Sequence, residues 1–335
     1  MKKYSFIPKI FRPAVPGSLR KIKKNVRAFI PATVEHQNKK KCPILISARD
    51  DIVSEWFYKL IDHSEHIKHL YYDDLGIKWD FSYSNNKIKI YLKNSSVVEP
   101  SSIYHRHPGF LKNHPFRAKH LAFFEVLDIW QGVILGQKRD HYHNSSKAYQ
   151  CITTISQAIS LVKDSSIKYP KSFFIKGSDI DFQSILIQKQ LIVKSNSSIR
   201  SEVVDSTIFS LWDHKNLENV PTLFQEKIDG IDHRVHVCPN FLWALQVLDK
   251  NTVDYRYSRS CVQYNQIELP KNIHLFCQKL AKIELNELIG IDLIAMNGVY
   301  FCLESNPGPG WSTFRHPSRI VFSRNLLTFL QQGDA

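Results

Sequence analysis

The sequence of 335 residues has no apolar run long enough to cross a membrane. Its longest apolar stretches, FLWALQVL (241–248) and LIGIDLIAM (288–296), are far shorter than the roughly 20 residues that a spanning helix needs. The basic N-terminus also lacks a continuous apolar segment and a small-residue cleavage site, so we do not expect a secretory signal. These absences speak against a membrane-embedded or secreted protein.

Cysteine is sparse, and its spacing excludes two further classes of protein. No CxxC pair is present, so neither a disulfide framework nor a zinc site is expected. Scattered cysteines in a chain of this size favour reduced thiols and a cytoplasmic location. The six are Cys42, Cys151, Cys238, Cys261, Cys277 and Cys302. We also find no convincing Ser/His/Asp or Cys/His combination for nucleophilic catalysis.

The positive charge is concentrated at one end of the chain. Residues 1–43 hold 12 Lys/Arg and a single acid, Glu35, and therefore account for +11 of the net charge of +14. The other 292 residues have a net charge of only +3. A nucleic-acid-binding body is therefore not expected. With 43% apolar and 23% charged residues, the body has the composition of an ordinary globular protein.

The basic extension contains one short helical pattern. Within SLRKIKKNVRAF (18–29), apolar residues recur every three or four positions, at Leu19, Ile22, Val26 and Phe29. This pattern predicts a basic amphipathic helix, which could bind an anionic membrane or an acidic partner, or could simply pack on the body of the protein. The sequence leaves these readings open, and it leaves the oligomeric state open as well, a homodimer being one option.

The body divides into three predicted units, all of the mixed α/β (α+β) class. Strands and a helix alternate over about 44–110, and a further amphipathic helix follows at 116–135. The second predicted unit contains a helix at 148–163 and the β-branched strand KQLIVKSN (189–196). The third contains paired alternating strands, a helix at 271–287 and a closing helix. We place the boundaries at 1–43, 44–135, 136–218 and 219–335.

The hairpin GIDLIAMNGVYFCLESNPGPG (290–310) carries the strongest chemical signal. Asn297-Gly298 is a strong hairpin-turn signal, which places Asp292 almost opposite Glu304, and Asn306 shares a face with Glu304. Two close carboxylates repel each other unless a cation neutralises them, and Mg²⁺ prefers such oxygen ligands. The three side chains therefore predict a metal site, although an acidic, solvated strand edge would have the same pattern.

The hairpin belongs to a longer ordered series. QEKIDGIDHRVHV (225–237), then DYR (254–256), then GID and CLESNPGPG resembles the C-terminal half of an ATP-grasp ligase. The closest relatives in kind are the RimK-like enzymes and the ATP-grasp ribosomal peptide maturases. The resemblance extends over about 44–320. It implies an ATP-grasp fold in which a small open α/β domain precedes a central lid domain and a C-terminal antiparallel-sheet domain.

The resemblance also implies a role for each matching residue. The adenine-binding hinge would be Gln225, Glu226, Lys227 and Ile228, with Asp232 near the ribose. The residues near the phosphates would be Arg234, Arg256, Lys147 and Lys194, where Arg234 and Arg256 face the transferred group. The ligands of Mg²⁺, or of Mn²⁺ in its place, would be Asp292, Glu304 and Asn306. The YHRHP segment (104–108) resembles the Tyr-x-Arg element that ends the family's first domain, and its Arg106 offers a cationic contact to an acidic substrate.

The implied reaction is an ATP-dependent ligation of a carboxylate to an amine or hydroxyl through an acyl phosphate. The first choice of substrate is a peptide with acidic side chains, and a precursor peptide is one possibility. One feature departs from the family, because the loop after Lys194, KSNSSIRSEVVDS, has no glycine. Three alternatives therefore stay open: phosphoryl transfer to a small molecule, nucleotide binding without catalysis, and a scaffold that acts through its basic helix.

Overall fold

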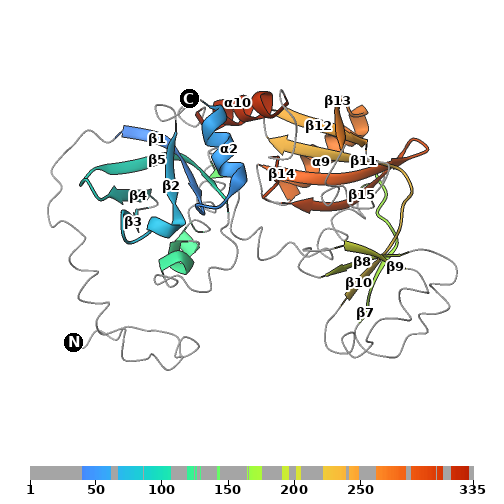
Figure 1. The fold of residues 1–335 in the computed structure, drawn as a ribbon, viewed down its shortest axis with the longest axis horizontal. Coiled ribbons are helices and arrows are strands. Elements are labelled where there is room, and N and C mark those ends of the chain that lie inside the picture. Colours follow the sequence, from blue (N-terminus) through green and yellow to red (C-terminus); the bar gives the residue numbers. More distant parts are fainter. Residues whose placement is uncertain are drawn as a thin grey trace.

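The computed structural model describes residues 40–61, 67–85, 87–106, 119–123, 125–126, 129, 142–143, 164, 166–175, 191–195, 201–204, 222–238, 241–248, 262–283, 288–306, 308–311 and 318–331. These residues form three β-sheets, each with its own strand order. Figure 1 shows the first sheet at the left, the last sheet at the upper right and the small middle sheet below it. No helix in the described ranges is long and apolar enough to cross a membrane. The predicted helix at 18–30 lies outside the described residues.

The first sheet has the order β2-β1-β5-β4-β3, with β6 pairing β5. Strand β1 runs parallel to both β2 and β5, whereas β4 is antiparallel to its two neighbours. The first sheet and its helix consist of β1 (Lys40–Ser47), α2 (Ile52–Leu60), β2 (Lys68–Tyr71), β3 (Trp79–Ser84), β4 (Lys87–Leu92), β5 (Val97–His105) and β6 (Tyr142–His143). This is the open α/β unit that the alternating pattern predicts, and helical residues at 119–123 pack Phe123 against it.

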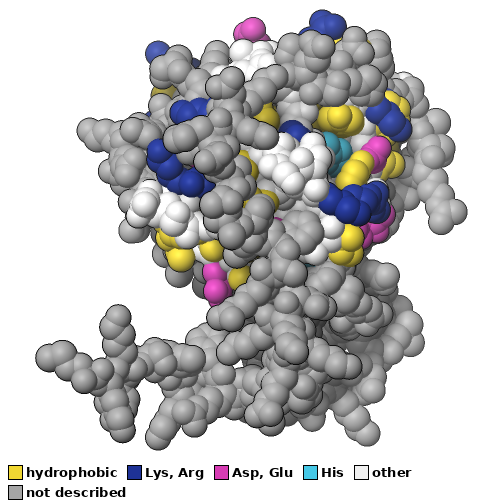
Figure 2. Space-filling view, turned by 90° about the vertical axis from the view of Figure 1, so that its left-hand side faces the viewer, with side chains coloured by type: hydrophobic (Ala, Val, Ile, Leu, Met, Phe, Trp, Pro, Cys, Tyr) yellow, Lys and Arg dark blue, Asp and Glu magenta, His cyan; other side chains and the backbone are white. Residues whose placement is uncertain are grey.

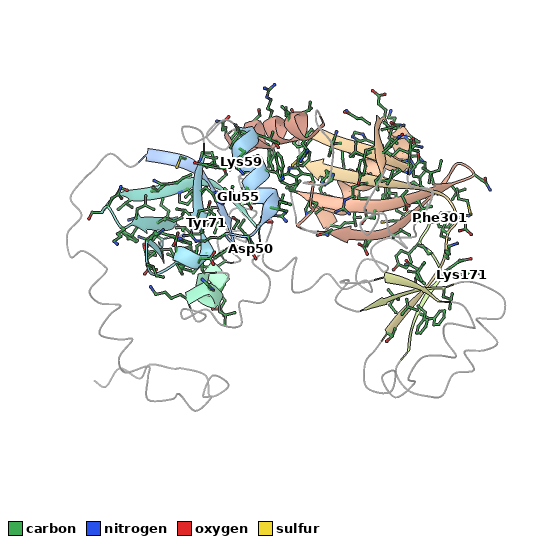
Figure 3. All side chains as sticks on the ribbon, in the orientation of Figure 1. Asp50, Glu55, Lys59, Tyr71, Lys171 and Phe301 are labelled. Carbon is green, nitrogen blue, oxygen red and sulfur yellow. The ribbon has the colours of Figure 1, made fainter. Side chains whose placement is uncertain are left out.

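The middle sheet is small and antiparallel, with the order β7-β10-β8-β9. Its strands are β7 (Ser172–Ile175), β8 (Leu191–Ser195), β9 (Ser201–Val204) and β10 (Thr222–Glu226). The segment before β7 joins this sheet to the last one. Lys168 pairs with Phe301 and exchanges backbone hydrogen bonds with Tyr300 and Cys302, while Lys171 O accepts from Glu226 N at 2.8 Å. Figure 3 labels Lys171 and Phe301 at this junction.

The last sheet has the order β13-β12-β11-β14-β15 and is antiparallel throughout. Its elements are β11 (Ile231–Cys238), β12 (Phe241–Leu248), β13 (Gln263–Ile267), α9 (Lys271–Ile283), β14 (Ile289–Met296), β15 (Val299–Asn306) and α10 (Ser318–Gln331). Helix α9 packs its buried face, which includes Phe276 and Leu280, on one side of the sheet. The opposite side of the sheet is therefore left for the site and for α10.

A single hydrophobic core joins the first and last sheets. Helix α10 contacts α2, β1 and β5 of the first sheet's unit, and Figure 1 shows it lying between the two sheets. The buried members of this core come from both units: Leu45, Val53, Phe57, Ile61, Ile67, Tyr104, Cys238, Trp243, Leu245, Leu288, Trp311, Phe322, Leu326, Phe329 and Leu330. Shared burial of this kind holds the two units in one relative position.

Charged side chains are spread over the described surface. In the face shown in Figure 2, which looks at the first sheet's side of the molecule, the Lys and Arg side chains that are drawn are interspersed with acidic and hydrophobic ones. They do not gather into one continuous basic patch on this face. This distribution agrees with the small net charge of residues 44–335.

Candidate active site

The predicted metal ligands lie together on one face of the last sheet. Arg234 on β11 pairs with Asp292 on β14, and Asp292 pairs with Glu304 on β15. Asn306 lies two residues beyond Glu304, opposite Gly290. Because paired residues project from the same face and alternate residues share it, Arg234, Asp292, Glu304 and Asn306 all lie on the face opposite α9. The structure therefore brings the three predicted ligands and the predicted phosphate-side arginine together.

A β-bulge directs Glu304 into the site. The two-residue turn has Asn297 at φ 52° and Gly298 at φ 76°, and regular pairing continues from it to Leu293 and Cys302. The register then shifts by one residue, so that Asp292 faces Glu304 rather than Leu303. Cys302 consequently points to the α9 core while Glu304, two residues later, points to the opposite face.

Asp292 is the central residue of the group. Its Oδ2 accepts a hydrogen bond of 2.5 Å from Nη1 of Arg234, and the two side chains are 17% and 8% exposed. Its Oδ1 is buried and has no hydrogen-bond partner among the described residues. An orphaned carboxylate oxygen facing a second carboxylate is a suitable ligand for a hard cation.

Asn306 completes an oxygen-rich set. Its Oδ1 accepts from the backbone N–H of Gly308 at 3.0 Å, which fixes the side chain and leaves the second lone pair of this oxygen. The described residues contain no cluster of three His, Cys, Asp or Glu side chains that could hold a metal ion. Two carboxylates and one amide oxygen nevertheless suit Mg²⁺, which commonly takes one or two carboxylates and fills its other positions with water and phosphate oxygens. The residues present therefore fit that ion.

A glycine makes room for the Arg234 side chain. A Cβ at Gly290 would lie 2.9 Å from Nη2 of Arg234 and 2.7 Å from Cβ of Pro309. The guanidinium therefore rests against the backbone of β14, directly beside the loop that follows Asn306. Gly290 was not among the residues predicted from the sequence. Only the tertiary contact explains why this position in a buried strand has no side chain.

The predicted adenine hinge lies at the end of β10 and leads into β11. Gln225 is buried, and its Nε2 donates to Ser172 Oγ at 3.2 Å. Lys227 and Ile228 follow the last paired residue of β10, and Nζ of Lys227 is held by Asp229 Oδ1 at 2.5 Å. Peptide groups beyond the end of a strand ladder are suited to bonding the edge of a flat ring.

The segment around Tyr169 connects the hinge to β15. Burial raises the pKa of Tyr169, and the nearby Cys302 and Glu304 raise it further, while the neighbouring Ser172 and Gln225 lower it. In the same segment, Lys168 exchanges backbone hydrogen bonds with Tyr300 and Cys302 of β15, and Lys171 O accepts from Glu226 N of the hinge. The segment before β7 therefore places the predicted hinge beside the predicted metal ligands. This bridging role was not predicted from the sequence.

The other predicted residues are described in part or not at all. Asp232 lies on β11 opposite Val247 and Ile294, and it is two residues from Arg234, on the same face of the sheet. Lys194 lies on β8 opposite Leu223, but its side chain is outside the described part of the structure. Lys147 and Arg256 are outside it entirely.

A buried histidine supports the floor of the site. His236 lies two residues from Arg234 on the same face and contacts the rings of Trp243, Trp311 and Phe322. Burial lowers the pKa of His236 well below its usual value, and the positive charge of Arg234 lowers it further. The imidazole is therefore neutral and acts as a packing group rather than as a second cation beside Arg234.

Comparisons with known proteins define the fold. No family model and no curated protein matches the chain. Among solved structures, the ATP-grasp ligase PsnB, complexed with a phosphomimetic variant of its minimal precursor, Mg and ADP, is similar with a TM-score of 0.67 at 19% identity; the match covers 89% of this chain and 100% of PsnB.

Two further solved structures are similar to this chain. A Chryseobacterium gregarium RiPP-associated ATP-grasp ligase, in complex with ADP and a leader and core peptide, has a TM-score of 0.65 at 14% identity, over 88% of this chain and 98% of that one. The macrocyclase MdnC from Microcystis aeruginosa MRC, bound with the precursor peptide MdnA, has a TM-score of 0.61 at 16% identity, over 87% and 99%. The chain thus has the fold of these ATP-grasp ligases, as the sequence resemblance predicted.

Proposed function

We propose that this protein is an ATP- and Mg²⁺-dependent ligase that joins a carboxylate to an amine or a hydroxyl group, with a peptide as its substrate. The observation that carries the proposal is the row Arg234–Asp292–Glu304, with Asn306 beside it, on the open face of an ATP-grasp sheet. The similar structures hold nucleotide, Mg and precursor peptides in their own sites, which supports the same classes of ligand here.

In this proposal the three units divide the work. The C-terminal unit (219–335) holds the cation through Asp292, Glu304 and Asn306, the hinge Gln225–Ile228 holds adenine, and Asp232 lies near the ribose. The central unit (136–218) covers the phosphates with Lys147 and Lys194, and the first unit contributes to the substrate side. The bound Mg²⁺ neutralises the charge of the triphosphate. ATP as co-substrate also makes the cytoplasm the place of action.

The chain's own residues position and neutralise the reacting groups. A substrate carboxylate oxygen attacks the γ-phosphorus, the bond to ADP breaks, and an acyl phosphate forms. The amine or hydroxyl then attacks the acyl carbon, phosphate leaves, and the nucleophile loses its proton. Arg234 and Arg256 stabilise the negative charge of the transferred group, because a planar guanidinium binds phosphate oxygens bidentately. Asp292 keeps the Arg234 guanidinium in a fixed orientation through the 2.5 Å bond.

The test is ADP release from purified protein against a panel of carboxylates and acidic peptides, with mass spectrometry of the products. We expect ADP and inorganic phosphate together with a condensed product, whose mass equals that of the carboxylate and the amine or hydroxyl components less one water. A Glu304→Gln variant, which keeps the shape and removes one ligand charge, should lose this activity by at least about 100-fold. Turnover that equals the parent's in this variant would contradict the assigned site, and a stable phosphoester product would replace ligation with phosphoryl transfer.

A further inference from the structure

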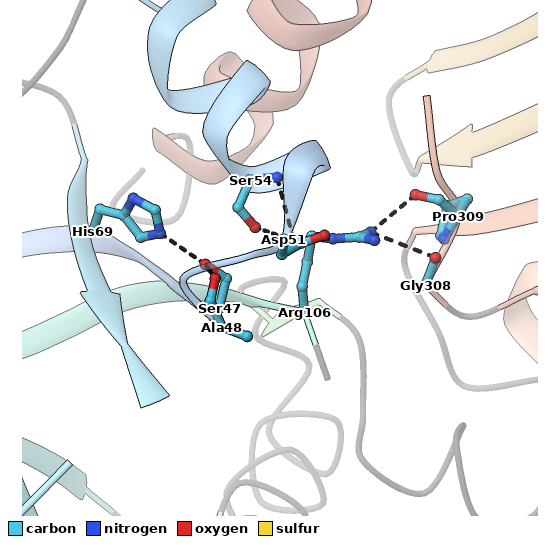
Figure 4. A network of polar contacts seen from close by, with 8 residues as sticks. All are labelled: Ser47, Ala48, Asp51, Ser54, His69, Arg106, Gly308 and Pro309. Atoms are coloured by element: carbon cyan, nitrogen blue, oxygen red, sulfur yellow. Dashed lines mark hydrogen bonds and ion pairs between the residues drawn. The ribbon is translucent and has the colours of Figure 1, made fainter. Parts of the chain in front are cut away.

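Arg106 directly follows strand β5 of the first unit but contacts the loop that follows the β14–β15 hairpin. It is the residue directly after β5, and its backbone N–H donates to Ile46 O on β1. Its side chain crosses to the C-terminal unit, where Nη1 donates to Pro309 O at 3.0 Å and lies 3.5 Å from Gly308 O (Figure 4). One side chain therefore links the two units through residues that are 203 positions apart in the sequence.

The other end of the guanidinium is held by Asp51. Nε of Arg106 donates to Asp51 Oδ2 at 2.5 Å, and the two side chains are 13% and 19% exposed. Asp51 is itself fixed, because it caps the N-terminus of α2 by accepting from the backbone N–H and the hydroxyl of Ser54. The Arg106 guanidinium is thus oriented by a rigid helix end on one side and by two carbonyl groups on the other.

The loop that Arg106 holds touches the site at two points. The N–H of Gly308 donates to Oδ1 of the predicted ligand Asn306. Pro309 lies against Gly290, at the place where Arg234 also rests. A displacement of residues 308–310 would therefore change the orientation of Asn306 and the room available to Arg234.

We propose that Arg106 is a positioning residue for the divalent-cation site. It holds Gly308 and Pro309 in place, and through them it orients Asn306 as a metal ligand and keeps Arg234 against β14. This role rests on the proposed function, and it differs from the cationic contact to an acidic substrate that the sequence suggested, because Nε and Nη1 are already engaged inside the protein. Removal of such an outer contact typically weakens metal affinity by roughly 10- to 100-fold.

The experiment measures Mn²⁺ binding by electron paramagnetic resonance in the presence of ADP, a readout that does not require turnover. Arg106→Ala should raise the Kd for Mn²⁺ by about tenfold or more. Arg106→Lys keeps the charge next to Asp51, but a single ammonium cannot reproduce the fork that joins Asp51 to the two carbonyls, so its Kd should also rise. Arg49→Ala is the matched control, since Arg49 lies in the same unit, its side chain is 48% exposed, and it pairs with Asp74 at 2.5 Å rather than with the loop at 308–310.

The outcomes separate this role from the proposed function. The role is supported when both Arg106 variants bind Mn²⁺ more weakly than the parent and Arg49→Ala binds it as the parent does. Parental Mn²⁺ affinity in Arg106→Lys, the variant expected to fold, overturns the role while leaving the ligase proposal intact. A parent that binds Mn²⁺ and ADP but releases no ADP from ATP with any peptide contradicts the ligase proposal alone, and a parent that binds no Mn²⁺ overturns both.

Discussion

At the scale of single residues, the site depends on a buried ion pair. Arg234 and Asp292 are both largely buried, and each neutralises the other. Loss of one partner of such a pair leaves an unpaired charge in a poorly hydrated place, which commonly costs about 3–5 kcal/mol. Asp292 therefore serves stability through Oδ2, while Oδ1 is left for a ligand. Substitution of either residue is consequently a poor test of catalysis alone.

Gly290 offers a cleaner test of the same geometry. We expect Gly290→Ala to push the Arg234 guanidinium and Pro309 away from β14, because the new methyl group would lie within 3 Å of both. ADP release should fall by at least about tenfold, a loss in the range expected for a catalytic group misplaced by 1 Å.

The matched control is Gly298→Ala in the hairpin turn. Gly298 has φ 76° with open space around its Cα, so alanine there should lower the free energy of unfolding by about 1 kcal/mol and leave ADP release unchanged. The comparison uses urea unfolding and ADP release on both variants. Equal activity in the two variants would contradict the role assigned to Gly290.

At the scale of elements, the bulge in β15 decides which residue enters the site. Regular antiparallel pairing from the Asn297-Gly298 turn would have placed Leu303 opposite Asp292. The extra residue changes the phase of β15, so that Cys302 stays in the α9 core and Glu304 faces Asp292. The number of carboxylates on β15 alone therefore does not define the site, because their position along the strand decides which face they occupy.

The bulge in β15 predicts the result of exchanging the neighbouring residues Leu303 and Glu304. A Leu303→Glu/Glu304→Leu double variant has the same composition as the parent, but its carboxylate lies at the position that the bulge directs away from Asp292. We expect Mg²⁺-dependent ADP release to be lost, by about 100-fold or more, and Mn²⁺ affinity to fall with it. Retention of both in the double variant would mean that strand register is free to slip and that the bulge does not determine the site.

At the scale of the whole molecule, the first and last sheets share one core. Trp311 is fully buried and directly follows the loop at residues 308–310, which Arg106 holds. Its ring contacts Phe57 and Tyr104 from the first unit and Phe322 from α10, with ring centroids 6.2, 6.1 and 4.7 Å away. The same contacts that join the units therefore also support the loop held by Arg106.

We expect Trp311→Ala to lower the free energy of unfolding by about 3–5 kcal/mol, the usual cost of removing a large buried aromatic side chain. Trp56→Ala is the control, because the Trp56 side chain on α2 is 37% exposed. The guanidinium of Arg319 lies over its ring, 4.4 Å from the ring centroid. Loss of the Trp56 side chain should cost about 1 kcal/mol or less. Urea unfolding of the two variants measures both, and equal losses would contradict a shared core centred on Trp311.

Local patterns in the sequence were sufficient for many of the described elements and for the position of several predicted site residues. Period-2 strands, the Asn297-Gly298 turn and the spacing of Asp292 and Glu304 depend on neighbours along the chain, so the hairpin and the pairing of its two carboxylates were predictable. The ordered motifs also predicted the ATP-grasp fold. What only the tertiary structure decided are contacts between distant segments: the room for Arg234 beside Gly290, the backbone bonds of Lys168 to β15, and the link from Arg106 to Pro309. These depend on packing between segments far apart in the sequence, where burial and hydrogen-bond geometry select the partners and spacing along the chain does not.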